Sequence, residues 1–251
     1  MLLFFIFGAF IGSFLGVLAD RIPRSETIIK GRSHCEFCKK ELKWLDLIPI
    51  FSFLFLKGKC RYCHKKLSWH YPIIELTTGI LFALTFLFLR SGFTISLLFY
   101  LIIVSSLIVI FFTDLKYGII PDKILLPAVI ISAVYLLIFS PQSLIMHLVS
   151  GFGACMFFLI LVLITKGKGM GTGDVKFAFL MGLFLGFPQI IVGLYIAFLT
   201  GALISIILVL WGKKNFFKGT IPFGPFLVLG TLTSIFLGNF LLQKALLFLG
   251  L

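Results

Sequence analysis

The chain has 251 residues, of which 60% are hydrophobic and only 12% are charged, and its mean hydropathy is +1.17. Soluble domains carry about 25% charged residues, so this composition excludes an ordinary soluble domain and predicts an integral membrane protein. The formal net charge of +13 would suit a nucleic-acid-binding protein. The distribution of the basic residues indicates membrane topology and anionic lipid headgroups instead, and we predict no nucleic acid partner.

Apolar runs divide the chain into candidate membrane segments. A helix needs about 17–25 apolar residues to cross about 30 Å of hydrocarbon, and most of the runs reach this length. The run at 175–187 is shorter and contains Gly182 and Gly186, so we expect it to be tilted, broken or only partly inserted. The prediction is an all-α fold, a polytopic membrane helix bundle of about eight transmembrane segments, with six or seven crossings as the alternative. The runs fall at about 1–19, 73–89, 93–112, 124–139, 144–165, 175–187, 189–211 and 223–248.

The basic residues predict the orientation. With the N-terminus outside, four loops lie on one side of the membrane, and these loops with their flanks contain 20 of the 22 Lys and Arg residues. Since basic loops favour the cytoplasm, we expect this face to be cytoplasmic. Arg21 and Arg24 follow the first apolar run and no basic residue precedes it, which predicts an uncleaved anchor rather than a secretory signal. The four loops are 20–72, 113–123, 166–174 and 212–222.

The loop at 20–72 is predicted to be a zinc-binding domain between an anchor at 1–19 and a transmembrane bundle at 73–251. It contains two Cys-x-x-Cys pairs that are 21 residues apart. Four thiolates suit a tetrahedral zinc site, and cytoplasmic thiols stay reduced, which argues against disulfides. A redox role for one pair, or a ligand supplied by His34 or His64, is the alternative. The expected zinc ligands are Cys35, Cys38, Cys60 and Cys63.

Residues 47–56, between the cysteine pairs, are too apolar for an open loop. We expect this segment to lie against the membrane or against the other segments. A domain of this size has little core of its own, so it would depend on the metal for its fold.

Two aspartates occupy the cytoplasmic ends of apolar runs. Asp114 follows the run that ends at Phe112, and Asp174 precedes the run at 175–187. A charged side chain at the centre of a spanning helix costs roughly 2.5–3.5 kcal/mol, so in a chain with only 9 acidic residues these positions indicate function. Two crossings separate the aspartates, so both should lie at the same face. Such a pair can share one proton, with one carboxylate as general base on water and its protonated partner polarising a carbonyl.

Alternate glycines precede Asp174. Glycines at every second position disfavour a regular helix. We expect an irregular strip that has room for an extended peptide. Protein or water should cover this strip. A phosphate-binding loop does not fit, because no predicted strand precedes the strip and its lysine and hydroxyl are in the wrong order. The glycines are Gly167, Gly169, Gly171 and Gly173.

Two charged residues near the aspartates have simpler interpretations. Lys176 could bias the ionisation of the pair, since an opposite charge favours a carboxylate, or it could be an ordinary cytoplasmic flanking lysine. Asp122 is expected to cap the segment that begins at Lys123.

Together these residues resemble the type IV prepilin peptidases, over nearly the whole chain and in the same order. Residues 12–17 followed by 21–23 resemble the first membrane segment of that family, although Gly16 stands where members often carry asparagine. Residues 32–63 resemble its zinc-binding loop. The further matches are residues 71–76, Asp114 with 120–122, residues 171–176, and residues 222–225.

The resemblance implies a GxGD-type aspartic endopeptidase of the bacterial inner (cytoplasmic) membrane. Such enzymes remove the short basic leader of type IV prepilins and pseudopilins at the cytoplasmic face, after a glycine and usually just before a phenylalanine. The implied catalytic pair is Asp114 and Asp174, with support from Gly171, Gly173 and Lys176. Many members with four cysteines also methylate the new N-terminus with S-adenosylmethionine. The methyl donor's site stays unassigned, although Glu75, which borders a membrane segment, could serve methylation.

Other classes stay open. Another GxGD protease, of the presenilin or signal-peptide-peptidase kind, would have no place for the zinc loop. A proton-coupled transporter would use Asp114 and Asp174 as a relay, but it would place acidic residues near the bilayer midplane and show internal repeats, neither of which the sequence indicates. A zinc-stapled membrane scaffold without activity is the remaining alternative.

Overall fold

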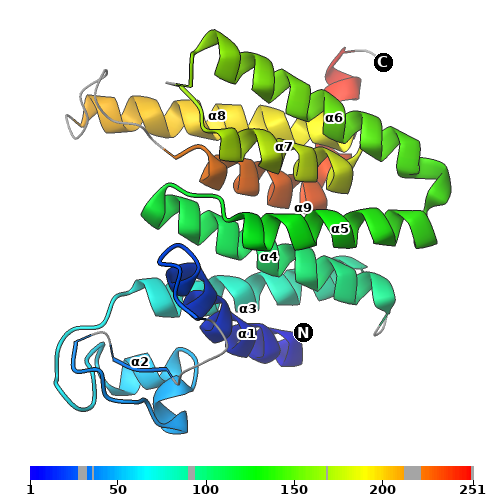
Figure 1. Ribbon diagram of the computed structural model, residues 1–251. Coiled ribbons are helices and arrows are strands. Elements are labelled where there is room, and N and C mark those ends of the chain that lie inside the picture. Colours follow the sequence, from blue (N-terminus) through cyan, green and yellow to red (C-terminus); the bar gives the residue numbers. More distant parts are fainter. Residues whose placement is uncertain (28–32, 36, 90–93, 168, 212–221, 250–251) are drawn as a thin grey trace. The chain divides into compact units, whose positions relative to one another are not determined.

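The computed structural model describes residues 1–27, 33–35, 37–89, 94–167, 169–211 and 222–249. Within these ranges the chain forms helices and no strand, apart from two isolated antiparallel bridges (Figure 1). The predicted all-α class is therefore confirmed. Most of the basic loop predicted at 212–222 lies outside the described residues, as do Arg90 and Lys168. The elements are α1 (Leu2–Arg21), the 3₁₀ helix η1 (Trp44–Leu47), α2 (Phe51–Phe55), α3 (His70–Leu89), α4 (Ile95–Tyr117), α5 (Asp122–Phe139), α6 (Pro141–Ile164), α7 (Thr172–Leu185), α8 (Gln189–Leu210) and α9 (Gly224–Leu249).

Seven of the described helices are long and apolar enough to cross a membrane, namely α1, α3, α4, α5, α6, α8 and α9. The chain is thus a multi-pass membrane protein. The eighth predicted segment forms α7, which has only 14 residues. At 1.5 Å per residue it is about 21 Å long, shorter than the roughly 30 Å of a hydrocarbon core. It ends where Gly186 turns the backbone into the left-handed region, with φ of +68°.

Although α7 is too short to be a candidate span, its neighbours cover it well. Eight of its 14 residues are buried, and it packs against α5, α6, α8 and α9. The contact with α6 is closest at Gly182, where an added Cβ would lie 2.5 Å from the Ser150 carbonyl oxygen. A helix that is apolar all round is expected in such a covered position.

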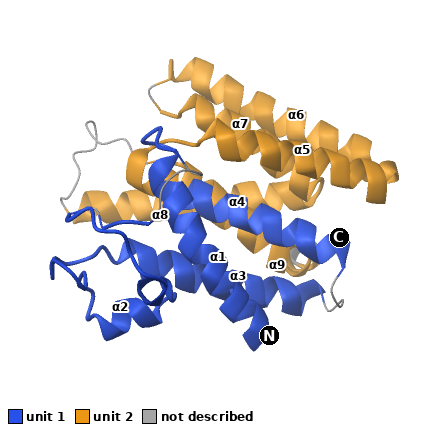
Figure 2. Ribbon diagram, turned by 60° about the horizontal axis from the view of Figure 1, so that its bottom comes forward, with its two compact units in different colours: residues 1–112 blue, residues 113–251 orange. Residues whose placement is uncertain are grey.

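The chain divides into two compact units, Met1–Phe112 and Thr113–Leu251 (Figure 2). In the first unit α1 packs along α3, and Gly12 lies so close to α3 that an added Cβ would be 2.8 Å from the Cα of Glu75. In the second unit α6 packs along α7, and α8 along α9. All four cysteines of the two Cys-x-x-Cys pairs belong to the first unit, and Asp114 and Asp174 both belong to the second.

The apolar segment between the cysteine pairs forms the end of η1 and the short helix α2. Phe53 is buried, whereas Phe51, Leu54 and Phe55 are exposed, Phe55 by 83%. Large exposed apolar side chains of this kind suit contact with a membrane surface, as the sequence predicts for residues 47–56.

Candidate active site and metal centre

Asp114 lies in the last turn of α4. Its backbone carbonyl accepts a hydrogen bond of 2.8 Å from the Gly118 N–H, and Gly118 ends the helix with φ of +67°. The residue is only 5% exposed, and its Oδ2 atom is buried with no hydrogen-bond partner among the described residues. Since an unsatisfied buried polar atom costs about 1–3 kcal/mol and more when charged, this oxygen is a strong indication of function.

Asp174 lies in the first turn of α7. Its Oδ2 atom accepts a hydrogen bond of 3.1 Å from the Gly171 N–H, and its own N–H donates to the Gly171 carbonyl at 3.2 Å. These two bonds close a small ring that holds the side chain at the start of the helix, where the helix dipole favours a carboxylate. The residue is 7% exposed.

Asp114 and Asp174 both lie in the second unit, and the charge of Asp114 acts on the carboxyl group of Asp174. The two side chains are therefore near one another, as the return of the chain to the same face predicts. Two buried carboxyl groups within each other's field do not ionise together readily. Such an arrangement can activate water and polarise a carbonyl.

The glycine strip is more ordered than the sequence suggests. Lys166 and Gly167 have positive φ angles of 51° and 71° and end α6, but Gly171 has an extended backbone with φ of −83° and Gly173 is helical. An added Cβ at Gly173 would lie 3.2 Å from the Cβ of Ile120. The strip therefore ends in a helix start, and only its first part uses the conformational freedom of glycine.

Lys176 pairs with Asp122 and not with the buried aspartates. Its Nζ atom lies 2.9 Å from both carboxylate oxygens of Asp122, and both side chains are 52% exposed. The predicted cap role of Asp122 is wrong, because α5 begins at Asp122 itself and Pro121 is the residue before the helix. The pair instead connects the first turns of α5 and α7, and an exposed pair of this kind contributes at most about 1 kcal/mol.

Gly224 lies beside Asp114, a position that residue type and spacing do not predict. An added Cβ at Gly224 would lie 2.5 Å from the Oδ2 of Asp114. This glycine belongs to the motif at 222–225, but no spacing rule indicates which buried side chain it meets.

The four cysteines come together in the first unit. The Sγ atoms of Cys35, Cys38, Cys60 and Cys63 all lie within 4.8 Å of one another, and those of Cys35 and Cys63 are 3.9 Å apart. Sulfur atoms bound to one tetrahedral zinc at about 2.3 Å are about 3.8 Å apart, so the cluster could hold such an ion. Its four members are all cysteines, so neither His34 nor His64 is needed to complete it.

The two cysteine pairs lie on similar turns. The Cys35 N–H donates to the Lys40 carbonyl at 3.0 Å, and the Cys60 N–H donates to the Lys65 carbonyl at 2.9 Å. Lys39 and His64 occupy equivalent left-handed positions with φ of 57° and 54°. Two similar turns that present two sulfurs each explain how a short loop makes a four-sulfur cluster.

The ionisation of the thiols also suits a metal. Burial acts to raise the pKa of Cys60, but the backbone N–H groups of Cys63 and Tyr62 lower this pKa to about 7. The N–H of Lys65 acts to lower the pKa of Cys63, yet burial and the neighbouring sulfurs raise it to about 11. The Cys60 thiolate forms easily and that of Cys63 is resisted, so a cation among the sulfurs would help both to ionise together.

A buried carboxylate connects the cysteine loop to α3. The Ile50 N–H donates a hydrogen bond of 2.6 Å to the Oε2 of Glu75, and Glu75 is only 8% exposed. Ile50, just before α2, has φ of +62°, an uncommon conformation for a β-branched residue. The loop is therefore fixed to the membrane helix at this point.

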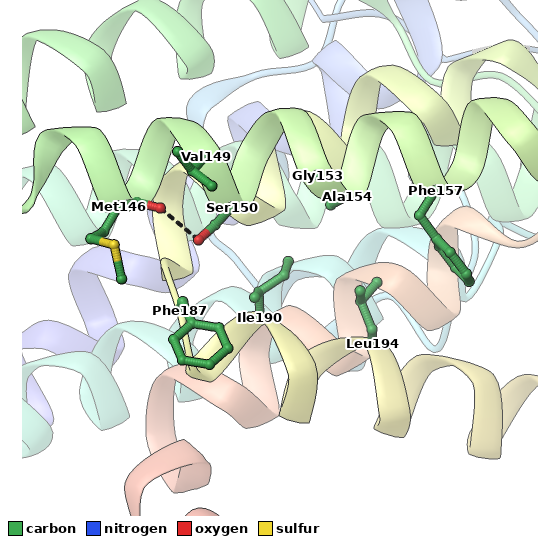
Figure 3. Close-up of a pocket in the computed structure, with 9 residues that line it drawn as sticks. All are labelled: Met146, Val149, Ser150, Gly153, Ala154, Phe157, Phe187, Ile190 and Leu194. Carbon is green, nitrogen blue, oxygen red and sulfur yellow. Dashed lines mark hydrogen bonds between the residues drawn. The ribbon is translucent and has the colours of Figure 1, made fainter.

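A hollow of about 470 Å³ lies between α6 and α8 in the second unit (Figure 3). Its lining is apolar except for Ser150, whose hydroxyl donates to the Met146 carbonyl at 2.7 Å. No titratable group lines it, so it can accommodate an apolar chain but cannot carry hydrolysis.

Two family models match this polytopic helical protein and define its class, that of the leader peptidases of the membrane. Residues 6–89 match the model for the bacterial peptidase A24 N-terminal domain, and residues 101–206 match the model for the type IV leader peptidase family. The first match contains the cysteines and the second contains Asp114 and Asp174.

Similar chains carry the name prepilin leader peptidase/N-methyltransferase. The protein of Bacillus subtilis is 34% identical over 235 residues, which is 94% of this chain and 93% of that one. That of Legionella pneumophila is 31% identical and covers 93% and 90% of the two chains. That of Neisseria gonorrhoeae is 29% identical and covers 88% and 84%.

The chain belongs to the prepilin leader peptidase/N-methyltransferase family. It is accordingly an enzyme, a peptidase with methyltransferase activity. No solved structure matches it.

Proposed function

We propose that the chain removes the basic leader of type IV prepilins or pseudopilins at the cytoplasmic face of the bacterial inner membrane, with Asp114 and Asp174 as the catalytic pair. The observation that supports this most directly is the electrostatic interaction between the two buried carboxyl groups. The unpartnered Oδ2 of Asp114 supports it further. The family resemblance implies that the scissile bond follows a glycine.

The proposed chemistry needs only the two carboxyl groups and water. One carboxylate removes a proton from water, and the oxygen bonds to the scissile carbonyl carbon. The protonated partner donates a hydrogen bond to the carbonyl oxygen as negative charge develops there. The C–N bond then breaks, and the leaving amine takes up a proton from the pair. Burial strengthens both interactions because the local dielectric is low.

The cysteine domain has a separate role in this proposal. We place structural zinc on Cys35, Cys38, Cys60 and Cys63, within a cytoplasmic domain at 20–72 that follows an anchor at 1–19. When bound, the ion would hold the two cysteine turns together. The bundle at 73–251 would carry the hydrolysis. In a second reaction, the new N-terminal amine would accept a methyl group from S-adenosylmethionine.

The decisive experiment compares three Asp→Asn variants on a co-expressed prepilin. Asp114→Asn and Asp174→Asn should each abolish trimming, whereas Asp122→Asn, at an exposed ion pair, should retain at least about a third of the rate. Mass spectrometry of the pilin N-terminus reports the cleavage site and any added methyl group together. Continued trimming by both buried-site variants would rule out the proposed pair.

The same experiment separates the other classes. A transporter with a proton relay at these positions would leave trimming unaffected in every variant. A GxGD protease with other substrates would leave the prepilin uncut by the wild-type chain as well. Only the proposed function predicts trimming that depends on the two buried aspartates and not on Asp122.

A further inference from the structure

Gly224, the first residue of α9, lies directly against Asp114. The three heavy atoms nearest to an added Cβ at this position all belong to Asp114, namely Oδ2 at 2.5 Å, Cγ at 3.0 Å and Cβ at 3.3 Å. Distances under about 3 Å are well inside the contact of two carbon or oxygen atoms. A side chain of any kind at residue 224 would therefore occupy the space that the carboxylate now uses.

The start of α9 is anchored, so it cannot readily move away from Asp114. The ring of Phe223 lies 5.2 Å from that of Phe198 and 6.0 Å from that of Phe226. Phe226 and Leu227 are buried, with 6% and 0% exposed. Aromatic contacts and buried apolar side chains of this kind hold a backbone firmly. A steric clash at residue 224 would therefore displace the carboxyl group of Asp114.

The Asp114 carboxyl group depends on the start of α9 for its direction. The backbone N–H of Gly224 acts on this carboxyl group, while its Oδ2 atom has no hydrogen-bond partner among the described residues. The Oδ2 of Asp174 is held by the Gly171 N–H, next to its own helix. Asp114 is thus oriented by the backbone of Gly224 and by the space that this glycine leaves.

We infer that Gly224 is a positioning residue of the peptidase site, because the absence of a side chain there sets the direction in which Asp114 faces its partner. This inference rests on the proposed function of the aspartate pair. It extends that function by adding a third segment, the start of α9, to the two that carry the carboxyl groups.

A matched comparison follows from Gly153 on α6, which carries no group of the proposed site. An added Cβ at Gly153 would have no neighbour within 4 Å. Gly153→Ala therefore makes the same chemical change, one added methyl group, without a conflict at Asp114.

The test measures Gly224→Ala and Gly153→Ala in the full-length protein in nanodiscs, with a prepilin as substrate. Misplacement of a reacting group by about 1 Å can cost about 100-fold in rate, so kcat of Gly224→Ala should fall by about that factor with KM within threefold. Gly153→Ala should stay within about threefold of wild type in kcat. Neither variant should unfold at a lower temperature, and the methylation of a pre-cleaved pilin should be unchanged in both.

The pH dependence of kcat distinguishes a positioning role of Gly224 from a merely structural role, which would leave this dependence unchanged. Two interacting carboxyl groups titrate as a pair with well-separated apparent pKa values, and a misdirected Asp114 should interact less. The bell-shaped profile of kcat should therefore become narrower in Gly224→Ala.

Three results would overturn the inference. The first is a kcat of Gly224→Ala within threefold of wild type. The second is a Gly153→Ala variant impaired as strongly as Gly224→Ala. The third is a loss of methylation together with cleavage, which would mean that the fold and not the carboxylate has changed. Failure of the proposed function is distinguishable, because Asp114→Asn and Asp174→Asn would then still cleave.

Discussion

The close contact between α6 and α7 links the packing of the second unit to the position of Asp174. A methyl group at Gly182 would lie 2.5 Å from the Ser150 carbonyl oxygen and 2.6 Å from the Cα of Gly151. Both neighbours are backbone atoms and cannot rotate away, so the helices would have to separate by roughly 1 Å to restore normal contact distances. Overpacking of this kind costs about 1–3 kcal/mol, and Gly182→Ala should lower the free energy of unfolding by that amount.

The same displacement should reach the candidate site, because Asp174 lies in the first turn of α7. We expect kcat for prepilin cleavage to fall by about 10- to 100-fold. The control is Gly153→Ala on α6, where an added Cβ has no neighbour within 4 Å, and where helix propensity predicts up to about 1 kcal/mol of stabilisation. Thermal unfolding in detergent and cleavage kinetics measure both effects. A Gly182→Ala variant as stable and active as Gly153→Ala would refute the reasoning.

Three further predictions concern the metal, the loop and the substrate. Cys38→Ser, or treatment with a strong chelator, should remove the zinc that elemental analysis of the wild-type protein is expected to find. Methylation should be abolished, while cleavage should stay within about threefold of wild type, since the aspartates lie in the other unit. A wild-type protein purified without metal would contradict this. Glu75→Leu should leave the Ile50 N–H unsatisfied at a cost of about 1–3 kcal/mol and speed its hydrogen exchange. Glu75→Gln keeps an acceptor and should have a smaller effect. Equal exchange of the Ile50 N–H in both variants would show that the hydrogen bond does not matter. Binding of prepilin in nanodiscs should weaken by less than about threefold as salt is raised, because the predicted cytoplasmic face has most of the +13 charge and would not attract a basic leader. We expect the apolar stem of the substrate, packed among the membrane segments, to supply the affinity instead. A steep loss of binding with added salt would contradict this.

The sequence predicted the features that depend on residue type and spacing. The four cysteines needed only two short pairs in one loop, and similar hydrogen-bonded turns then bring the sulfurs together. The interaction of Asp114 with Asp174 followed from counting crossings between them.

Features that depend on three-dimensional packing could not be predicted in this way. The neighbour of Gly224 depends on where α9 begins relative to α4, and the partner of Lys176 on how α5 meets α7. The short run at 175–187 did predict an unusual segment, but the sequence did not indicate that other helices of its unit cover α7. A run of apolar letters does not show whether lipid or protein covers it.

The short α7 explains how two carboxyl groups can be stable in so apolar a bundle. Four helices cover it, so Asp174 at its start faces protein and not hydrocarbon, where an ionised side chain would cost several kcal/mol. That coverage requires glycine at the closest contacts, as at Gly182 against the backbone of α6 and at Gly173 against the side chain of Ile120. Gly224 has the same property beside the side chain of Asp114. These glycines therefore act by allowing close approach, whereas Gly118 and Gly167, which follow α4 and α6, act through positive φ angles. Substitutions that add even one methyl group at the close contacts should impair the site more than substitutions within the strip that precedes α7.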